Sequence, residues 1–531
     1  MARSQPYTVA CAGGLVKSAN SIDLLRTPGV ARELRNFEVS IEGGYRRING
    51  YYKFGEGSAT QPTGSADQIL GVTPYADGVI ACAGTGIYFS QDGITWMQIN
   101  KLSATGGDSY ATFVAKAATA RTGQGQVSFA LFEGAGEDYG KIIIADGANK
   151  LFQFRMEGTG ALSTRTFFTS LITVDGTNGV KYIASHDHHL IAAGVENNET
   201  TVYYSVHNDQ DDFSGAGAGS IAISDKIVGI RGFRADLIIF CENSIHKLIN
   251  IDDSQTVAIV SIAENVGCLS GYSIQEIGGD LVFLAPDGIR TVAGTARIGD
   301  VELGTVSKAI QPLLNDIARN INDYTINSMV HRDKSQYRLF YSDLVGINNG
   351  IIGTLRPNGF EWSEIRGIEV SAIGTAFNEV GIEEHYHGST SGYVYVHDAG
   401  NSFDGSNILA RFGTPDYDYG DLGTLKTLHY LKVSASSEGV VSPDVQVRFD
   451  YGSPDTPQPP NLFDLGTIDP PSLFGDAVFG TNVFGGAESP LIRVPLQGSG
   501  YSNNFTVISE DSNPPYTING FYIDFIPSGR R

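Results

Sequence analysis

Short apolar runs separated by glycine-containing turns recur along most of this chain, and this repetition constrains the fold more strongly than any other feature. The stretch 67–96 contains four such runs, with turns at Asp77-Gly78 and Gln91-Asp92-Gly93. Runs of this kind, rich in β-branched and aromatic residues and bounded by glycine, are typical of strands. Comparable units recur at intervals of roughly 40 to 60 residues, as the blades of a β-propeller do. We therefore predict β-propeller-like repeats over 65–404. Further units lie near 127–154, 182–205, 227–248, 272–292, 336–362 and 372–396.

The composition agrees with this interpretation. The 531 residues include 65 Gly, 20 Pro, 27 Phe and 25 Tyr, which are turn formers and strand formers. A hydrophobic content of 41% is sufficient for packed cores and excludes a disordered chain. Because the length exceeds what one core normally serves, we expect two or three domains or one large repeat array.

One α-helix is predicted near 305–320, inserted into the array. Val306, Ala309, Ile310, Leu313, Leu314 and Ile317 follow helical spacing and would form one apolar stripe. We expect Thr305 to cap its N-terminus and Asn320 to Asp323 to end it.

The two ends of the chain differ from the repeats. Residues 1–64 are predicted to form an N-terminal arm and a hairpin, with alternating runs 37–41 and 45–48 around Glu42-Gly43-Gly44. Residues 405–531 are predicted to form a C-terminal β domain, with a Pro/Phe-Gly-rich loop at 453–486. The expected fold class is therefore all-β with one inserted α-helix, a β-propeller plus a C-terminal β-sandwich-like domain.

The charge is strongly negative, with 58 Asp and Glu against 36 Lys and Arg and a formal net charge of −22. Sequence-independent nucleic-acid binding needs a surplus of basic residues, so this charge argues against it. The four cysteines, Cys11, Cys82, Cys241 and Cys268, lack metal-site spacing, and we expect buried thiols. No long apolar segment follows the first residues, so we expect no signal peptide and no membrane span.

Two histidine clusters are the first candidates for a site. His186-Asp187-His188-His189 is predicted to be a hairpin tip, because adjacent residues in an extended or turn segment point in different directions. In Glu383-Glu384-His385-Tyr386-His387, the alternation places His385 and His387 on one strand face. A third ligand is not evident near His385 and His387, so we predict no metal site at either cluster.

Acidic and basic clusters are the remaining candidates. Asp209 to Asp212 and Asp416 to Asp421 could hold Ca²⁺, but neither matches the EF-hand pattern, and solvated loops are the expectation. Arg46-Arg47 is expected to be a solvated basic pair on the hairpin. No GxSxG, P-loop or HExxH motif is present. We therefore assign no catalytic, cofactor-binding or metal residue, expect no cofactor, and expect that the protein is not an enzyme.

Three regions of the chain carry a resemblance to a known family. They are 22–24 with 31–37 and 43–50, then 266–268 with 283–290 and the helix after Thr305, and finally 411–416 with Lys426 and 447–452. Together these regions resemble the tail-nozzle (packaged-DNA stabilisation) proteins of short-tailed bacteriophages. The resemblance implies a homo-hexameric ring below portal and adaptor proteins, with propellers around a channel for double-stranded DNA and with tail fibres or spikes attached. It also implies a virion tail protein that is made in the host cytoplasm.

If the resemblance holds, the negative net charge also agrees with a channel for DNA. A negatively lined channel would let DNA slide without specific binding. The alternative is a carbohydrate-binding or carbohydrate-processing β-propeller. That alternative requires a central pocket in which carboxylates and aromatic side chains converge on the blade loops.

Overall fold

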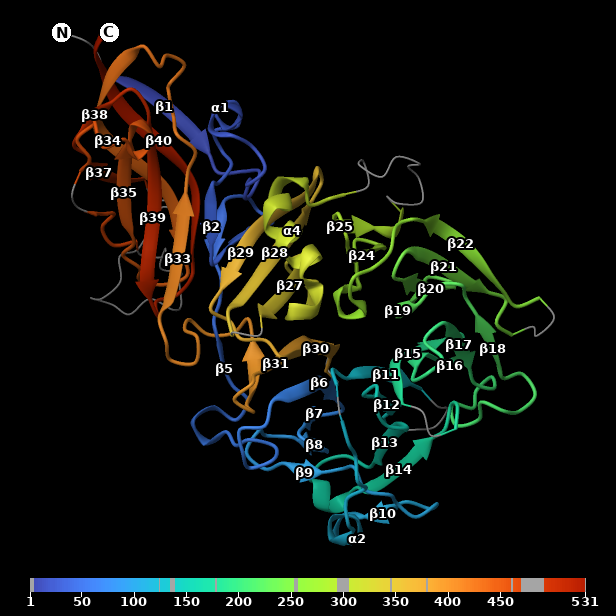
Figure 1. Ribbon diagram of the computed structural model, residues 1–531. Helices are drawn as coiled ribbons and strands as arrows, with labels where there is room; N and C mark the ends of the chain where they lie inside the picture. The colour runs from blue at the N-terminus through green and yellow to red at the C-terminus, as the bar shows by residue number, and fades with distance from the viewer. Residues whose placement is uncertain are drawn as a thin grey trace.

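Small antiparallel sheets form a ring, and a two-sheet sandwich is joined to one side of this ring (Figure 1). The computed structural model describes residues 4–123, 125–133, 139–176, 179–252, 256–293, 305–343, 346–378, 381–459, 462–468 and 491–530. Within these ranges almost every regular element is a strand, which confirms the all-β prediction.

Six separate sheets of the ring are blades of a β-propeller. In each blade all pairs are antiparallel, and most strands pair with their neighbours in the chain; the exceptions are β10, which pairs with β14, and β5, which pairs with β32. The turns lie where glycine predicts them: Tyr75 pairs with Gly78 across Ala76-Asp77, and Ala76 has a φ of 51°. The blades are, in chain order, β6 (Ile69–Tyr75), β7 (Gly78–Ala83), β8 (Gly86–Ser90) and β9 (Met97–Gln98); β10 (Asp108–Ser109), β11 (Ser128–Phe132), β12 (Lys141–Ala145), β13 (Leu151–Glu157) and β14 (Thr166–Ile172); β15 (Val180–His186), β16 (His189–Val195), β17 (Thr201–Tyr204) and β18 (Gly219–Ala222); β19 (Ile227–Phe233), β20 (Asp236–Cys241), β21 (Ser244–Ile249) and β22 (Ala258–Glu264); β23 (Gln275–Ile277), β24 (Asp280–Ala285) and β25 (Gly288–Thr291); and β30 (Ala372–Phe377), β31 (Glu383–Gly388), β32 (Val394–His397) and β5 (Tyr51–Lys53).

The last of these blades is completed by a strand from the N-terminal region. In β5, Tyr51 pairs with His397 and Lys53 with Tyr395 of β32. Gly50, just before β5, packs so closely against Ser402 that an added Cβ would lie 1.9 Å from the Ser402 carbonyl oxygen. The two ends of the propeller segment are therefore fastened together by hydrogen bonds.

A nine-stranded sheet occupies the remaining place in the ring and continues into the sandwich. Its first four strands lie between the β23–β25 and β30–β32 blades (Figure 1). β2 then joins them to the sandwich, because it pairs parallel with β29 and antiparallel with β33. The sheet comprises β26 (Tyr324–His331), β27 (Gln336–Asp343), β28 (Asn348–Arg356), β29 (Gly359–Arg366), β2 (Glu33–Arg35), β33 (Ile408–Gly413), β39 (Asn503–Asp511), β35 (Asp444–Phe449) and β36 (Phe463–Asp464).

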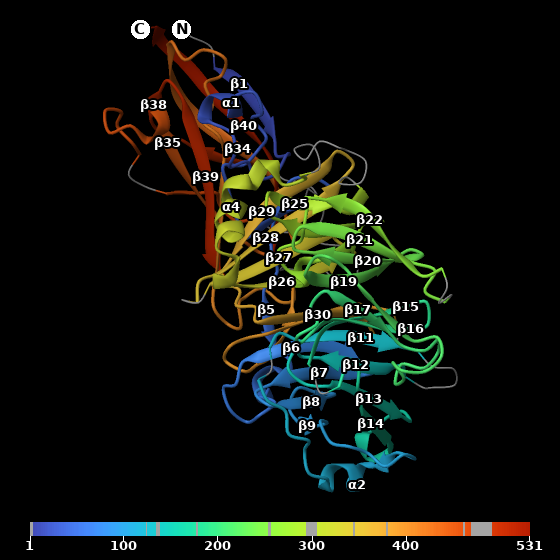
Figure 2. The same ribbon diagram turned by 45° about the vertical axis from the view of Figure 1, so that its right-hand side comes forward.

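A seven-stranded sheet covers the other side of the sandwich core. Phe412 of the nine-stranded sheet stacks on Phe521 of this sheet, with ring centroids 5.7 Å apart. The two chain ends described lie side by side at the far end of the sandwich, as both views show (Figures 1 and 2). The sheet comprises β1 (Gln5–Ala10), β3 (Phe37–Val39), β4 (Tyr45–Arg47), β34 (Thr424–Ser437), β37 (Leu491–Pro495), β38 (Ser499–Gly500) and β40 (Tyr516–Arg530).

The predicted helix is present but begins later than expected. α4 (Gln311–Arg319) follows a 3-10 turn at Lys308–Ile310, and its last residue, Arg319, lies next to the predicted end. The predicted cap Thr305 instead forms a bridge with Arg290 beside β25. Two further short helices, α1 (Ser21–Leu24) and α2 (Tyr110–Ala115), were not predicted. None of the helices in the described ranges is long and apolar enough to span a bilayer.

The N-terminal segment is part of the sheets. The predicted hairpin is confirmed, with Phe37 opposite Arg47. β1 and β4 both pair with β40, so strands of 1–64 and of 405–531 share one core. The domain boundaries at 64 and 404 themselves remain a prediction. Of the Pro/Phe-Gly-rich loop at 453–486, residues 460–461 and 469–486 lie outside the described residues.

Candidate functional site

The central cavity of the ring has a volume of about 240 Å³. Residues from β6, β11, β15, β19, β23, β26 and β30 line it, together with residues of the turn before β23, so seven sheets meet there. Its polar lining includes Arg231, Arg332, Gln275 and Asn327. Among the described residues that line the cavity there is neither Asp nor Glu.

A larger cavity of about 660 Å³ lies at the side of the ring and is here named the histidine pocket. Its walls are β31, the end of β32 with Asp398 and Ala399, the segment 54–56 after β5, and His331 at the end of β26. β26 and β31 lie on either side of β30, and the packing of adjacent blades brings His331 and His385 together. Their ring centroids are 4.4 Å apart.

Glu383 completes a cluster with these two histidines. One ligand-type atom from each of His331, Glu383 and His385 lies within 4.8 Å of the other two. His385 Nε2 is 3.7 Å from Glu383 Oε2. The backbone N–H of Arg332 donates to Glu383 Oε2 at 2.9 Å, and the Arg332 guanidinium pairs with Oε1. Glu383 and His385 belong to the same sequence motif, whereas His331 lies more than 50 residues earlier, so a search for a third ligand near His385 and His387 could not find it.

His385 and His387 are neutral at physiological pH. Burial, together with His331 and Arg338, lowers the pKa of His385 to about 3. Burial alone lowers the pKa of His387 to about 3. His385 and His387 are both buried, and His387 Nδ1 lies 3.2 Å from His397 Nδ1.

A buried charge network lies next to the pocket and connects the ring to the sandwich. Lys334 Nζ lies 3.0 Å from Glu38 Oε1 and 2.7 Å from Asp398 Oδ2, and Arg338 also pairs with both carboxylates. Arg46 contacts Glu38 at 2.8 Å. Although burial opposes ionisation, Lys334 and Arg338 hold the pKa of Glu38 below its usual value. Glu38 belongs to β3 of the sandwich, whereas Arg338 belongs to β27 of the ring.

The first histidine cluster is a hairpin tip, as predicted. His186 pairs with His189, and Asp187 and His188 between them have positive φ values. The structure adds partners that the sequence pattern does not indicate: Asp252 Oδ1 lies 3.1 Å from His189 Nε2 and 2.9 Å from His207 Nδ1. These three residues form a second group whose atoms could approach one ion.

The expectation of solvated charged clusters is wrong at two positions, Arg47 and Asp416. Arg47 is fully buried and pairs with Asp511 at 3.1 Å. Asp416 is 1% exposed, accepts from Asn504 at 2.8 Å and pairs with Arg32, and burial raises its pKa. Side-chain burial on the inner faces of the sandwich sheets cannot be deduced from a run of like charges. The four cysteines are buried free thiols, as predicted.

Comparison with known proteins gives no family for this chain. No protein-family model and no curated protein matches it. Among solved structures, Raptor of Chaetomium thermophilum aligns with a TM-score of 0.41 and 8% identity over 66% of this chain and 30% of its own. PorZ, a bacterial surface component of the type-IX secretion system of Porphyromonas gingivalis, aligns with a TM-score of 0.37 and 10% identity over 81% and 59%. An exo-β-1,3-galactanase from Phanerochaete chrysosporium aligns with a TM-score of 0.24 and 9% identity over 90% and 100%. Similarities this low do not extend to function.

Proposed function

We propose that this chain is a structural subunit of a short-tailed phage tail. Six copies would form a nozzle ring that extends the DNA channel, helps to retain and eject the genome, and anchors fibres or spikes. The resemblance over 22–50, 266–290 and 411–452 suggests this role. The observation that supports it best is the nine-stranded sheet that runs from the ring into the sandwich without interruption.

A shared sheet makes the molecule a rigid spacer. Interfaces between separate domains usually permit relative motion unless they are large and apolar. Here β2 hydrogen-bonds to both sides, and one apolar core contains residues of α4, of the β26–β29 strands and of both sandwich sheets. A subunit of a tail must transmit its position from one neighbour to the next, and a rigid connection between two modules serves that purpose.

The charge supports the proposed channel. Six copies would each contribute a formal charge of −22. Such an assembly would repel the phosphate backbone, so DNA would pass through it without being held. A channel wall dominated by Lys and Arg would contradict this part of the proposal.

The carbohydrate-processing alternative receives less support from the ring. Glycoside hydrolysis uses a pair of carboxylates on either side of the sugar. The described residues that line the central cavity include arginines but no carboxylate. The described lining of the central cavity therefore lacks the pair of carboxylates that glycoside hydrolysis needs.

Native mass spectrometry and particle imaging of the full chain test the proposal. We expect a species of six times the chain mass and closed rings with six-fold symmetry. A chain that remains monomeric in the presence of the other tail proteins, and that cleaves or binds an oligosaccharide, would overturn the proposal in favour of the alternative.

A further inference from the structure

We propose that His331, Glu383 and His385 bind a divalent transition-metal ion, with Zn²⁺ as the best match, at the wall of the histidine pocket. This inference does not rest on the proposed tail function, and it concerns residues on one subunit only.

The spacing of the three side chains fits one ion. Tetrahedral zinc with bonds of about 2.0–2.2 Å holds its ligand atoms about 3.3 Å apart. Glu383 Oε2 and His385 Nε2 are already 3.7 Å apart, and the whole group lies within 4.8 Å. Side-chain adjustments of about 1 Å would therefore complete the first three bonds.

Two buried nitrogen atoms support the site independently. Within the described residues, His331 Nδ1 and His385 Nε2 have no hydrogen-bond partner, and the two residues are 9% and 7% exposed. A buried polar atom without a partner is costly, and buried polar groups are normally satisfied. A metal ion between the two rings would use both lone pairs.

The second ring nitrogen of each histidine has a polar partner, as it does in metal sites. His331 Nε2 lies 3.0 Å from Asp398 Oδ2, and His385 Nδ1 lies 3.1 Å from Thr375 Oγ1. Ligating histidines usually use their second nitrogen in this way, and such contacts fix the tautomer and the ring orientation. Glu383 is oriented by Arg332, as ligating carboxylates are by their own hydrogen bonds.

The donor set selects the class of metal. Two imidazoles and one carboxylate suit zinc and its neighbours in the first transition row, whereas Ca²⁺ and Mg²⁺ prefer oxygen ligands alone. The histidine pocket supplies an entry path and room for a fourth ligand such as water.

The second group, His189, His207 and Asp252, is a weaker candidate. His207 and Asp252 have side chains that are 45% and 55% exposed, and both ring nitrogens of His189 already have partners, Ser205 O and Asp252. This group therefore provides a control for metal binding elsewhere on the chain.

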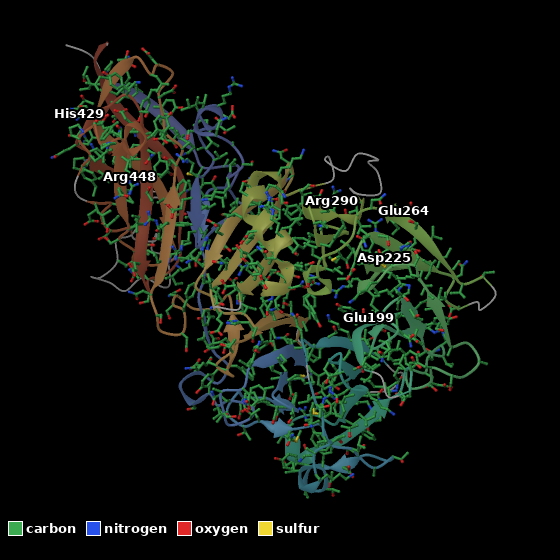
Figure 3. All side chains as sticks on the ribbon, viewed as in Figure 1. Glu199, Asp225, Glu264, Arg290, His429 and Arg448 are labelled. Atoms are coloured by element: carbon green, nitrogen blue, oxygen red, sulfur yellow. The ribbon has the colours of Figure 1, made fainter. Side chains whose placement is uncertain are left out.

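The test uses the full chain, stripped with a chelator and titrated with Co²⁺ alone, followed by Zn²⁺. We expect one Co²⁺ per chain with visible absorption typical of four- or five-coordinate sites, and its displacement by Zn²⁺. His331→Gln and His385→Gln should weaken Co²⁺ binding at least about tenfold. His207→Gln and His429→Gln should leave it unchanged; His429 lies on the sandwich, distant from the ring (Figure 3).

Glu383→Gln keeps the side-chain volume and serves if a histidine variant folds poorly. We expect it to retain the circular dichroism spectrum of the parent and to lose Co²⁺ affinity as the histidine variants do. The proposal is overturned if the parent binds no Co²⁺, if Glu383→Gln binds it as tightly as the parent, or if only His207→Gln abolishes binding. A chain that forms no hexamer but binds Co²⁺ as described would overturn the tail proposal and leave the metal site supported.

Discussion

Glu38 shows how much a single buried side chain contributes to the joint between the two modules. It is 2% exposed and receives contacts from Lys334, Arg338 and Arg46. A buried ion pair is often no more stabilising than an apolar pair of the same shape, because desolvation offsets the attraction. Removing one partner is different, since it leaves the opposite charges buried without compensation.

Glu38→Gln should therefore destabilise the protein by about 3–5 kcal/mol, as loss of one partner of a buried pair does. Urea unfolding followed by circular dichroism measures this change. Glu438→Gln is the matched control, because Glu438 also pairs with Arg46 but is 55% exposed, and its loss should cost less than about 1 kcal/mol. Equal effects of the two substitutions would contradict this account.

The stability difference between the parent protein and Glu38→Gln should depend on pH. Lys334, Arg338 and Arg46 lower the pKa of Glu38, although burial and Asp398 oppose this effect. The stability contributed by a carboxylate with a lowered pKa is fully present above its unfolded value of about 4.3 and is lost as the pH falls further. The difference in unfolding free energy between the parent and Glu38→Gln should therefore stay constant from about pH 7 to 5 and narrow below about pH 4. A difference in unfolding free energy that becomes larger as the pH falls would contradict a lowered pKa of Glu38.

At the scale of the element, β5 determines whether the ring is closed. It is only three residues long, and its pairing with β32 joins parts of the chain separated by more than 300 residues. Gly50 lets the chain enter this strand close to Ser402. The closure therefore depends on a backbone contact in which no side chain fits.

Gly50→Ala should destabilise the closed ring by about 1–3 kcal/mol, because its Cβ would overlap the backbone of Ser402. Gly57→Ala is the control, since an added Cβ there meets no atom within 4 Å, and its effect should stay within about 0.5 kcal/mol. Hydrogen exchange at Tyr51 to Lys53 should be faster in Gly50→Ala alone. Unchanged exchange there would show that β5 does not depend on this glycine.

The strands were predictable because their signals are local. Turns such as Asp77-Gly78 and alternating runs such as 37–41 depend on neighbouring residues only. The start of α4 was not predictable in this way: Ser307 Oγ accepts the backbone N–H of Ile289, and the Val306 carbonyl accepts the Trp362 indole N–H. Apolar periodicity does not register such tertiary hydrogen bonds.

The candidate metal site shows the same limit more clearly. The His-x-His spacing at His385 and His387 is visible in the sequence, but His331 lies more than 50 residues earlier. Only the packing of β30 between β26 and β31 brings it to His385. His387, which the spacing favours equally, contacts His397 instead.

At the scale of the whole molecule, the proposed assembly of six subunits predicts a role for the Phe-Gly repeats. Deleting 473–486, which lie outside the described residues, should leave the monomer folded and disturb ring assembly or genome retention. Circular dichroism, native mass spectrometry and infectivity of virions that carry the deletion measure the three properties. Intact rings and full infectivity would reject this role.

The pairing of β1 with β40 has a consequence for synthesis of the chain. Gln5 lies opposite Phe525, so a strand made near the start requires a partner made more than 500 residues later. At about 5–20 residues per second, a ribosome takes roughly 25–100 s to make the intervening chain. Most propeller strands emerge in the meantime with their partners beside them in sequence, and these strands can pair at once. The sandwich, although its first strands are translated earliest, is therefore the last part of the molecule to close.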